Sequence, residues 1–90
     1  MLYTVAYDIT DDNRRAKVAK ILQDFGTRVQ YSLFECNTDR RAFLRLQHRL
    51  QAEIDPAEDT VTFYHLCAAC EKQIHRLGLK KGLDKKSYIV

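Results

Sequence analysis

The chain has 90 residues, of which 46% are hydrophobic and 30% are charged, and its formal net charge is +3 at pH 7. This length suits one domain, and the balance of apolar and charged residues is that of a globular protein rather than a disordered chain. No apolar run is long enough to span a membrane, and no cleavable apolar segment suggests export. We therefore expect a single domain over residues 1–90, located in the cytoplasm and without membrane contact.

The first predicted element is a strand over residues 2–9, which ends on the carboxylate of Asp8. The run is rich in β-branched and aromatic residues, which favour strands. Alternation separates two faces, neither of them plainly polar: Tyr3, Val5, Tyr7 and Ile9 on one, and Leu2, Thr4, Ala6 and Asp8 on the other. Because a chain of this length supplies helices for only one face of a sheet, we expect a second subunit to cover the other.

A helix is predicted next, with an apolar stripe at helical spacing that consists of Val18, Ile21, Leu22 and Phe25. Thr10 or Asp11 can cap its start, and Gly26 can end it. Arg14 and Arg15 flank the stripe near the start of the helix, so we expect them to stand near the end of the preceding strand. The alternative is that both arginines lie along the surface with their aliphatic stems packed.

Residues 27–36 alternate again and predict one strand, bent or broken near Tyr31. A second helix is expected after the capping residues 37–39 and before Pro56, and its buried stripe is Phe43, Leu46, Leu50 and Ile54. On the opposite side of this helix a basic row faces solvent, formed by Arg41, Arg45 and Arg49. Such a row is more often a solubility feature than a binding surface.

The last clear element is a strand over residues 59–66, after which the pattern weakens. We expect a short helix or turn over residues 68–72, followed by a strand near residues 74–79. Residues 79–90 are predicted to form a basic loop and a C-terminal strand, 87–90, that pairs with a sheet edge of the partner subunit. The order of elements predicts an α+β, ferredoxin-like fold of the βαββαβ type, with two helices on one face of an antiparallel sheet and an added C-terminal strand.

Asp8 is the strongest candidate for chemistry, because a carboxylate oxygen at a strand end is a suitable ligand for Mg²⁺. A lone aspartate at such a place serves about as often as a helix cap or an ion-pair partner. Two copies of Asp8 across a two-fold axis would make a paired site from one residue. No phosphate-binding glycine loop and no nucleophile elbow occurs in the sequence.

Cys67 and Cys70 have the spacing of zinc ligands or of a redox pair, and Cys36, His65 and His75 could complete a zinc site. A second Cys-x-x-Cys pair is absent from the sequence. Small buried cysteines are the more common case, so we expect packing rather than a zinc site.

One stretch of the sequence resembles a known family, the small CRISPR-associated endoribonucleases that accompany the spacer integrase. The resemblance is carried by Tyr7-Asp8-Ile9, Asp11-Asp12-Asn13-Arg14-Arg15, Gly26, and Arg28-Val29-Gln30-Tyr31-Ser32-Leu33-Phe34-Glu35. It implies a ferredoxin-like homodimer whose two sheets pack face to face. It also implies a part in the spacer-acquisition stage of antiviral defence, with integrase subunits and nucleic acid as partners.

Carried over position by position, the resemblance implies Asp8 as the Mg²⁺ ligand of each protomer. It implies that five residues support catalysis: Tyr7, Asp8, Arg15, Arg28 and Phe34. The expected phosphate-binding residues are Arg14, Arg15, Lys17 and Arg28, where Lys17 stands at a position that holds arginine in some members and so lacks the bidentate fork.

Three functions stay open at this point. The first is magnesium-dependent cleavage of phosphodiesters in single-stranded RNA or double-stranded DNA, and the second is a noncatalytic adaptor that bridges integrase subunits and duplex DNA. The third is a ligand-binding module of the same fold, which predicts a small-molecule pocket and no metal at Asp8.

Overall fold

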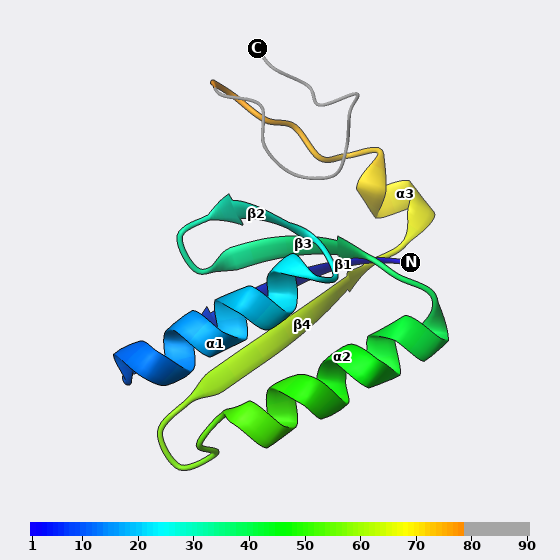
Figure 1. Ribbon diagram of the computed structural model, residues 1–90. Helices are drawn as coiled ribbons and strands as arrows, with labels where there is room; N and C mark the ends of the chain where they lie inside the picture. The colour runs from blue at the N-terminus through cyan, green and yellow to red at the C-terminus, as the bar shows by residue number, and fades with distance from the viewer. Residues whose placement is uncertain (79–90) are drawn as a thin grey trace.

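The computed structural model describes residues 1–78, so the expected loop and strand within residues 79–90 lie outside the described part. The elements are β1 (Leu2–Asp8), α1 (Asp12–Gln23), β2 (Thr27–Gln30), β3 (Leu33–Asn37), α2 (Arg40–Glu53), β4 (Thr60–Leu66) and α3 (Ala68–Glu71). The two longer helices, α1 and α2, lie on the same face of the sheet (Figure 1). The predicted α+β fold, with two helices on one face of an antiparallel sheet, is confirmed. No helix within residues 1–78 is long and apolar enough to cross a membrane.

The sheet has four antiparallel strands in the order β2-β3-β1-β4, which puts β1 between two neighbours. Thr4 pairs with Glu35 of β3 and with Tyr64 of β4, and Asp8 pairs with Thr60 of β4. We call the face away from α1 and α2 the open face. Its side chains from β1 and β4 are Leu2, Thr4, Ala6, Asp8, Thr60, Thr62, Tyr64 and Leu66.

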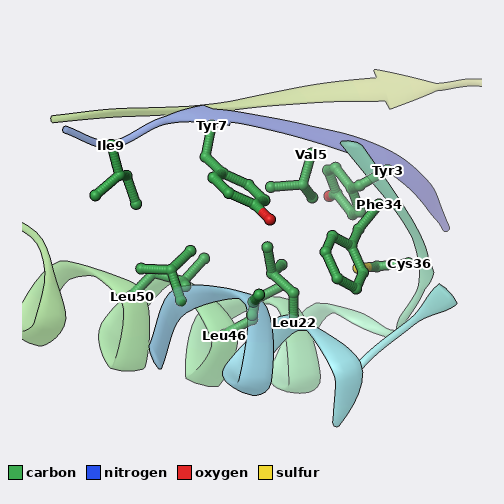
Figure 2. Close-up of a cluster of buried hydrophobic side chains, with 11 residues drawn as sticks. Tyr3, Val5, Tyr7, Ile9, Leu22, Phe34, Cys36, Leu46 and Leu50 are labelled. Atoms are coloured by element: carbon green, nitrogen blue, oxygen red, sulfur yellow. The ribbon is translucent and has the colours of Figure 1, made fainter. Parts of the chain in front are cut away.

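The core lies between the other face of the sheet and the two helices (Figure 2). The β1 residues that face the helices are all less than 9% exposed, and they meet fully buried side chains of β3, α1 and α2. These core residues are Tyr3, Val5, Tyr7, Ile9, Val18, Leu22, Phe34, Cys36, Leu46 and Leu50. Burying each large apolar side chain contributes about 1.5–3 kcal/mol, so this layer stabilises the contact between helices and sheet.

Both helices begin at an aspartate, as their sequences predict. The carboxylate of Asp11 accepts a hydrogen bond from the backbone N–H of Arg14 at 2.8 Å, and Asp39 accepts one from Ala42 at 2.7 Å. Each bond satisfies one of the backbone donors that the first turn of a helix leaves without a partner. α2 ends at Glu53, before Pro56.

Residues 27–36 form a hairpin rather than one strand, which corrects the expected single element. β2 and β3 pair with each other across a turn at Tyr31 and Ser32, and the register shifts by a bulge between Arg28 and Gln30. Alternation of side chains continues through such a turn in the sequence, so the pattern alone did not reveal the reversal. The break near Tyr31, one of the two alternatives, is the correct one.

Gly26 follows α1, but its backbone has no positive φ that would require glycine. Instead, a Cβ atom at this position would lie 2.2 Å from the carbonyl oxygen of Glu35 and 2.6 Å from the Sγ of Cys36. Glycine is therefore needed because the chain passes directly against β3 as it enters β2.

After β4, the short helix α3 is confirmed, while the strand expected after it near residues 74–79 is wrong for the described residues. Arg76 makes only an isolated bridge, and no strand forms within residues 72–78. The Arg76 guanidinium instead forms an ion pair with Glu35 of β3, which ties the segment back to the sheet.

Candidate functional site

Asp8 lies where β1 ends, with its side chain on the open face. Because side chains alternate along a strand, the Asp8 side chain points away from the helices, whereas those of Tyr7 and Ile9 point toward them. The residue is exposed, and among residues 1–78 no hydrogen-bond donor or cation contacts its carboxylate. The structure therefore leaves this carboxylate accessible, which confirms the predicted place of Asp8 at a strand end.

Arg15 reaches from the first turn of α1 back to the end of β1. Its guanidinium donates to the carbonyl of Ile9 at 2.8 Å and also forms an ion pair with Asp12. Ile9 is the residue directly after Asp8, so this bond holds Arg15 close to the strand end, as predicted. Its side chain is 32% exposed.

The β2–β3 turn brings Arg28 to the same end of the sheet. The backbone N–H of Tyr7 donates to the Ser32 carbonyl at 3.2 Å, so the turn lies beside β1 just before Asp8. Arg28 donates to the carbonyl of Tyr31, and its guanidinium lies 5.1 Å from the ring centroid of Phe34. This cation–π contact orients an arginine that is otherwise exposed.

Tyr7 and Phe34 lie in the core, on the face of the sheet opposite to the Asp8 side chain. Tyr7 is 5% exposed and its hydroxyl donates to the Tyr31 carbonyl at 3.3 Å, while Phe34 is fully buried. Neither side chain can touch a molecule that is bound by the Asp8 carboxylate. Their predicted part in activity stays a prediction, and the structure limits it to positioning the strand and the turn.

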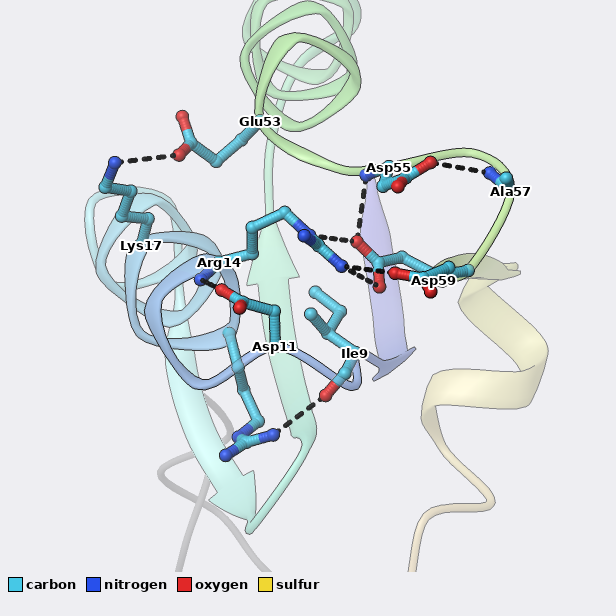
Figure 3. Close-up of polar contacts among 10 residues, drawn as sticks. Ile9, Asp11, Arg14, Lys17, Glu53, Asp55, Ala57 and Asp59 are labelled. Carbon is cyan, nitrogen blue, oxygen red and sulfur yellow. Dashed lines mark hydrogen bonds and ion pairs between the residues drawn. The ribbon is translucent and has the colours of Figure 1, made fainter.

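Arg14, which the sequence placed near Asp8 as a phosphate-binding residue, is held by acids of the loop before β4 (Figure 3). Its Nε donates to Asp59 at 2.8 Å, and its terminal nitrogen contacts Asp59 at 3.2 Å and Glu58 at 3.3 Å. The Asp59 side chain is fully buried and also accepts from the backbone N–H of Asp55. The guanidinium of Arg14 holds the pKa of Asp59 below its ordinary value, and Asp59 in turn raises the pKa of Arg14.

Lys17 is also directed away from Asp8. Its ammonium lies 3.6 Å from the carboxylate of Glu53 in α2, and the pair is largely exposed (Figure 3).

The structure thus divides the four predicted phosphate-binding residues into two pairs. Arg15 and Arg28 are held at the same end of the sheet as Asp8, by bonds to the carbonyls of Ile9 and Tyr31, and we call these three residues the β1-end cluster. Arg14 and Lys17 are paired with carboxylates of other elements.

Comparison with known proteins gives this arrangement a family. A family model described as CRISPR associated protein Cas2 matches residues 1–74. The chain belongs to the Cas2 family. This confirms the resemblance carried by the residues around Asp8 and by the hairpin sequence.

Relatives in the Cas2 family match over most of their length. The CRISPR-associated endoribonuclease Cas2 3 of Synechocystis sp. is 49% identical over 77 residues, covering 86% of this chain and 84% of the relative. The CRISPR-associated endonuclease Cas2 2 of Thermus thermophilus is 43% identical over 70 residues, covering 78% of each chain. The crystal structure of Streptococcus pyogenes Cas2 matches with a TM-score of 0.77 at 35% identity, covering 87% of this chain and 100% of that one.

The donor atoms of this Cas2 family member fit a magnesium ion only in part. Mg²⁺ prefers carboxylate and water oxygens, and Asp8 offers an accessible carboxylate without a competing cation. Within residues 1–78 no group of three or more His, Cys, Asp or Glu side chains could hold a metal, and Asp59 is committed to Arg14. A magnesium ion at Asp8 would therefore need water ligands or a second copy of Asp8 to complete its coordination.

Sequence reasoning missed two acidic residues of this Cas2 chain. The sequence pattern places Asp59 at the start of a strand and Glu35 within the hairpin motif, yet each binds an arginine distant in the sequence. Both are only about 5% exposed, a property that no local pattern shows. A charged residue inside or directly before an apolar strand is the one signal that pointed to a buried ion pair.

Proposed function

We propose that this protein is a magnesium-dependent endonuclease that acts in the cytoplasm, in the spacer-acquisition stage of CRISPR defence, on phosphodiesters of single-stranded RNA, double-stranded DNA or both. The observation that carries the proposal is the accessible Asp8 carboxylate, free of partners among the described residues, at the end of the sheet where Arg15 and Arg28 are also held. Relatives in the Cas2 family are named endoribonucleases or endonucleases, which supports the same reaction class.

Each member of the β1-end cluster has a distinct role in this proposal. Asp8 would hold the magnesium ion, which when bound lowers the pKa of a coordinated water and offsets negative charge on phosphate oxygens. Arg28 donates one N–H group to a backbone carbonyl, and Arg15 donates to a carbonyl and pairs with Asp12, so each guanidinium keeps further N–H donors for a phosphate. Tyr7 and Phe34 fix the β2–β3 turn and hence the position of Arg28.

We further propose that the active form is a homodimer joined through the open face. Tyr64 is 57% exposed in the middle of β4, beside the half-buried Thr4 and Ala6 of β1. A partly apolar sheet face of this kind is normally covered by another layer, and α1 and α2 both lie on the opposite side. Because Asp8 points toward this face, a two-fold axis through it can bring two copies of Asp8 together.

The test is the substitution Asp8→Asn, which keeps size and removes charge, beside Asp24→Asn as a matched control. Asp24 is an exposed aspartate whose carboxylate contacts only the exposed Arg49 among residues 1–78, so the control changes charge equally and leaves the cluster intact. We expect Asp8→Asn to lose magnesium-dependent cleavage of RNA and DNA and to keep the oligomeric mass measured by light scattering. The Asp24→Asn variant is expected to cleave normally. Cleavage by purified Asp8→Asn at the wild-type rate would remove Asp8 from the mechanism.

The second candidate is a noncatalytic adaptor that bridges integrase subunits and duplex DNA. The observation that favours it is the single carboxylate of the β1-end cluster, since one chain alone supplies too few ligands for a metal centre within residues 1–78. An adaptor keeps binding DNA and supporting spacer insertion with Asn at position 8. A nuclease loses its reaction with the same change, so spacer insertion and cleavage measured on one variant separate the two functions.

A further inference from the structure

Two cysteines form a pair directly after β4, at a place that the proposed nuclease function does not use. Cys67 and Cys70 flank the first turn of α3, and both are exposed free thiols, so the expected packing of buried cysteines is wrong for these two residues. The backbone N–H of Cys70 donates to the Sγ of Cys67 at 3.4 Å. The Cys67 sulfur therefore lies against the backbone of Cys70, within a single turn of the chain.

The environment makes the two thiols unequal. Hydrogen bonds from the backbone N–H and then from the thiol of Cys70 lower the pKa of Cys67. The hydrogen bond with the Cys67 side chain and the charge of Cys67 raise the pKa of Cys70. Since the thiolate is the nucleophile in disulfide exchange, Cys67 is the thiol prepared to attack and Cys70 the one prepared to resolve.

We propose that Cys67 and Cys70 are a redox-active dithiol, which small disulfides of the glutathione type oxidise to an intrachain disulfide. In the first step the Cys67 thiolate attacks one sulfur of the small disulfide, so that a mixed disulfide forms and one small thiolate leaves. Cys70 then attacks the Cys67 sulfur, which closes the protein disulfide and expels the second small thiolate. The protein loses two electrons and two protons, and the oxidant leaves as two thiols.

The dithiol is separate from the β1-end cluster. Cys67 follows Leu66, which pairs with Leu2 at the start of β1, whereas Asp8 pairs with Thr60 at the other end of the same ladder. The proposal therefore goes beyond the nuclease function and is independent of it. Nuclease activity and thiol chemistry can be measured on the same protein without one result deciding the other.

A zinc site is the competing use of the two sulfurs, and the geometry opposes it. Structural zinc takes four ligands, and the pair supplies two. Within residues 1–78 no third His, Cys, Asp or Glu side chain joins them in a group that could hold a metal. Cys36 is completely buried in the core, and burial raises its pKa to about 11, so it can neither bind such an ion nor react readily.

Closing the disulfide would act on the segment that returns to the sheet. Backbone bonds from Glu71 to Cys67 and from Gln73 to Cys70 hold this turn, and the Arg76–Glu35 ion pair fixes its far end. These backbone hydrogen bonds break and re-form when the turn opens locally. A covalent link across the turn would restrain that opening. We expect slower amide hydrogen exchange at Glu71 and Gln73 in the oxidised protein.

The experiment incubates the native protein with oxidised glutathione, blocks remaining thiols by alkylation and analyses peptides by mass spectrometry. We expect the peptide that holds Cys67 and Cys70 to become lighter by two hydrogen atoms, while Cys36 stays a thiol and acts as the internal control. The Cys70→Ser variant should accumulate glutathione on Cys67. In the Cys67→Ser variant, glutathione should attach to Cys70 at least about threefold more slowly than it attaches to Cys67 in Cys70→Ser, as expected for a difference in thiolate fraction.

Three results would overturn the proposal. Equal rates in the two single variants would show that Cys67 is not the prepared nucleophile. Disulfides that join Cys36 or two different chains, in place of the intrachain one, would show that the pair does not close. Stoichiometric zinc that remains with the protein after chelation would assign the two sulfurs to a metal instead.

Discussion

Replacing Tyr7 with Phe removes one hydroxyl from the core and keeps the ring, so it separates packing from chemistry. The hydroxyl donates to the Tyr31 carbonyl at 3.3 Å, a long bond, and that carbonyl also accepts from Arg28. A net hydrogen bond stabilises a protein by about 0.5–1.5 kcal/mol, and because the acceptor keeps a partner we expect the low end, about 0.5 kcal/mol. For a domain of this size that lowers the unfolding midpoint by about 2–4 °C.

The assay measures thermal unfolding by circular dichroism, and then cleavage of RNA and DNA well below the midpoint. Because Tyr7 faces the core, Asp8 faces the open face and Arg28 keeps its own bond to the Tyr31 carbonyl, Tyr7→Phe should retain most of the wild-type cleavage rate, with Asp8→Asn as the inactive reference. If Tyr7→Phe lost as much cleavage as Asp8→Asn while its midpoint stayed unchanged, the hydroxyl would take part in the reaction and the packing role argued for Tyr7 would be wrong.

Three further predictions concern binding, pH and backbone packing. Arg15→Ala should weaken duplex DNA binding and reduce its salt slope by about one, whereas Arg45→Ala, an exposed arginine of α2, should change both less; equal effects in titrations at several salt concentrations would point to overall charge. Asp59 has a lowered pKa, so its stabilisation is present above its ordinary value of 3.8 and is lost as the pH falls through the lower folded value; acid unfolding of Asp59→Asn should show a flatter pH dependence, and an unchanged slope would contradict this. Gly26→Ala should lower the free energy of unfolding in urea by about 1–3 kcal/mol because its Cβ would meet the β3 backbone, and a stabilised variant would refute the close approach.

The fold was predictable from the sequence because each helix carries its own boundary signals. Asp11 and Asp39 cap the two helices as their sequences indicate, and Pro56 follows the end of α2. The strand before Asp8 was clear because its apolar run and its terminal carboxylate are both local features. Such signals depend on neighbours in the sequence and need no tertiary contact.

The parts that failed depend on contacts between distant residues. The reversal at Tyr31 and Ser32 occurs without glycine or proline at the turn, and it is held in part by bonds from Tyr7 of another strand. Arg14 was expected beside Asp8, but a buried acid 45 residues away binds it. The sequence around Asp59 and around Arg14 looks like that of ordinary solvent-exposed charged residues. Only the folded arrangement therefore reveals which arginine remains free to bind a phosphate.

The place of β1 inside the sheet also determines when the candidate site can form. β1 is made first, yet its two neighbours are β3 and β4, and Asp8 pairs with Thr60 near the other end of the described chain. During synthesis the first strand can pair with β3 once the chain through Asn37 has emerged, but it lacks its second neighbour until the chain through Leu66 has emerged. A ribosome-bound fragment that lacks β4 therefore carries every residue of the β1-end cluster but not the strand that pairs with Asp8 itself.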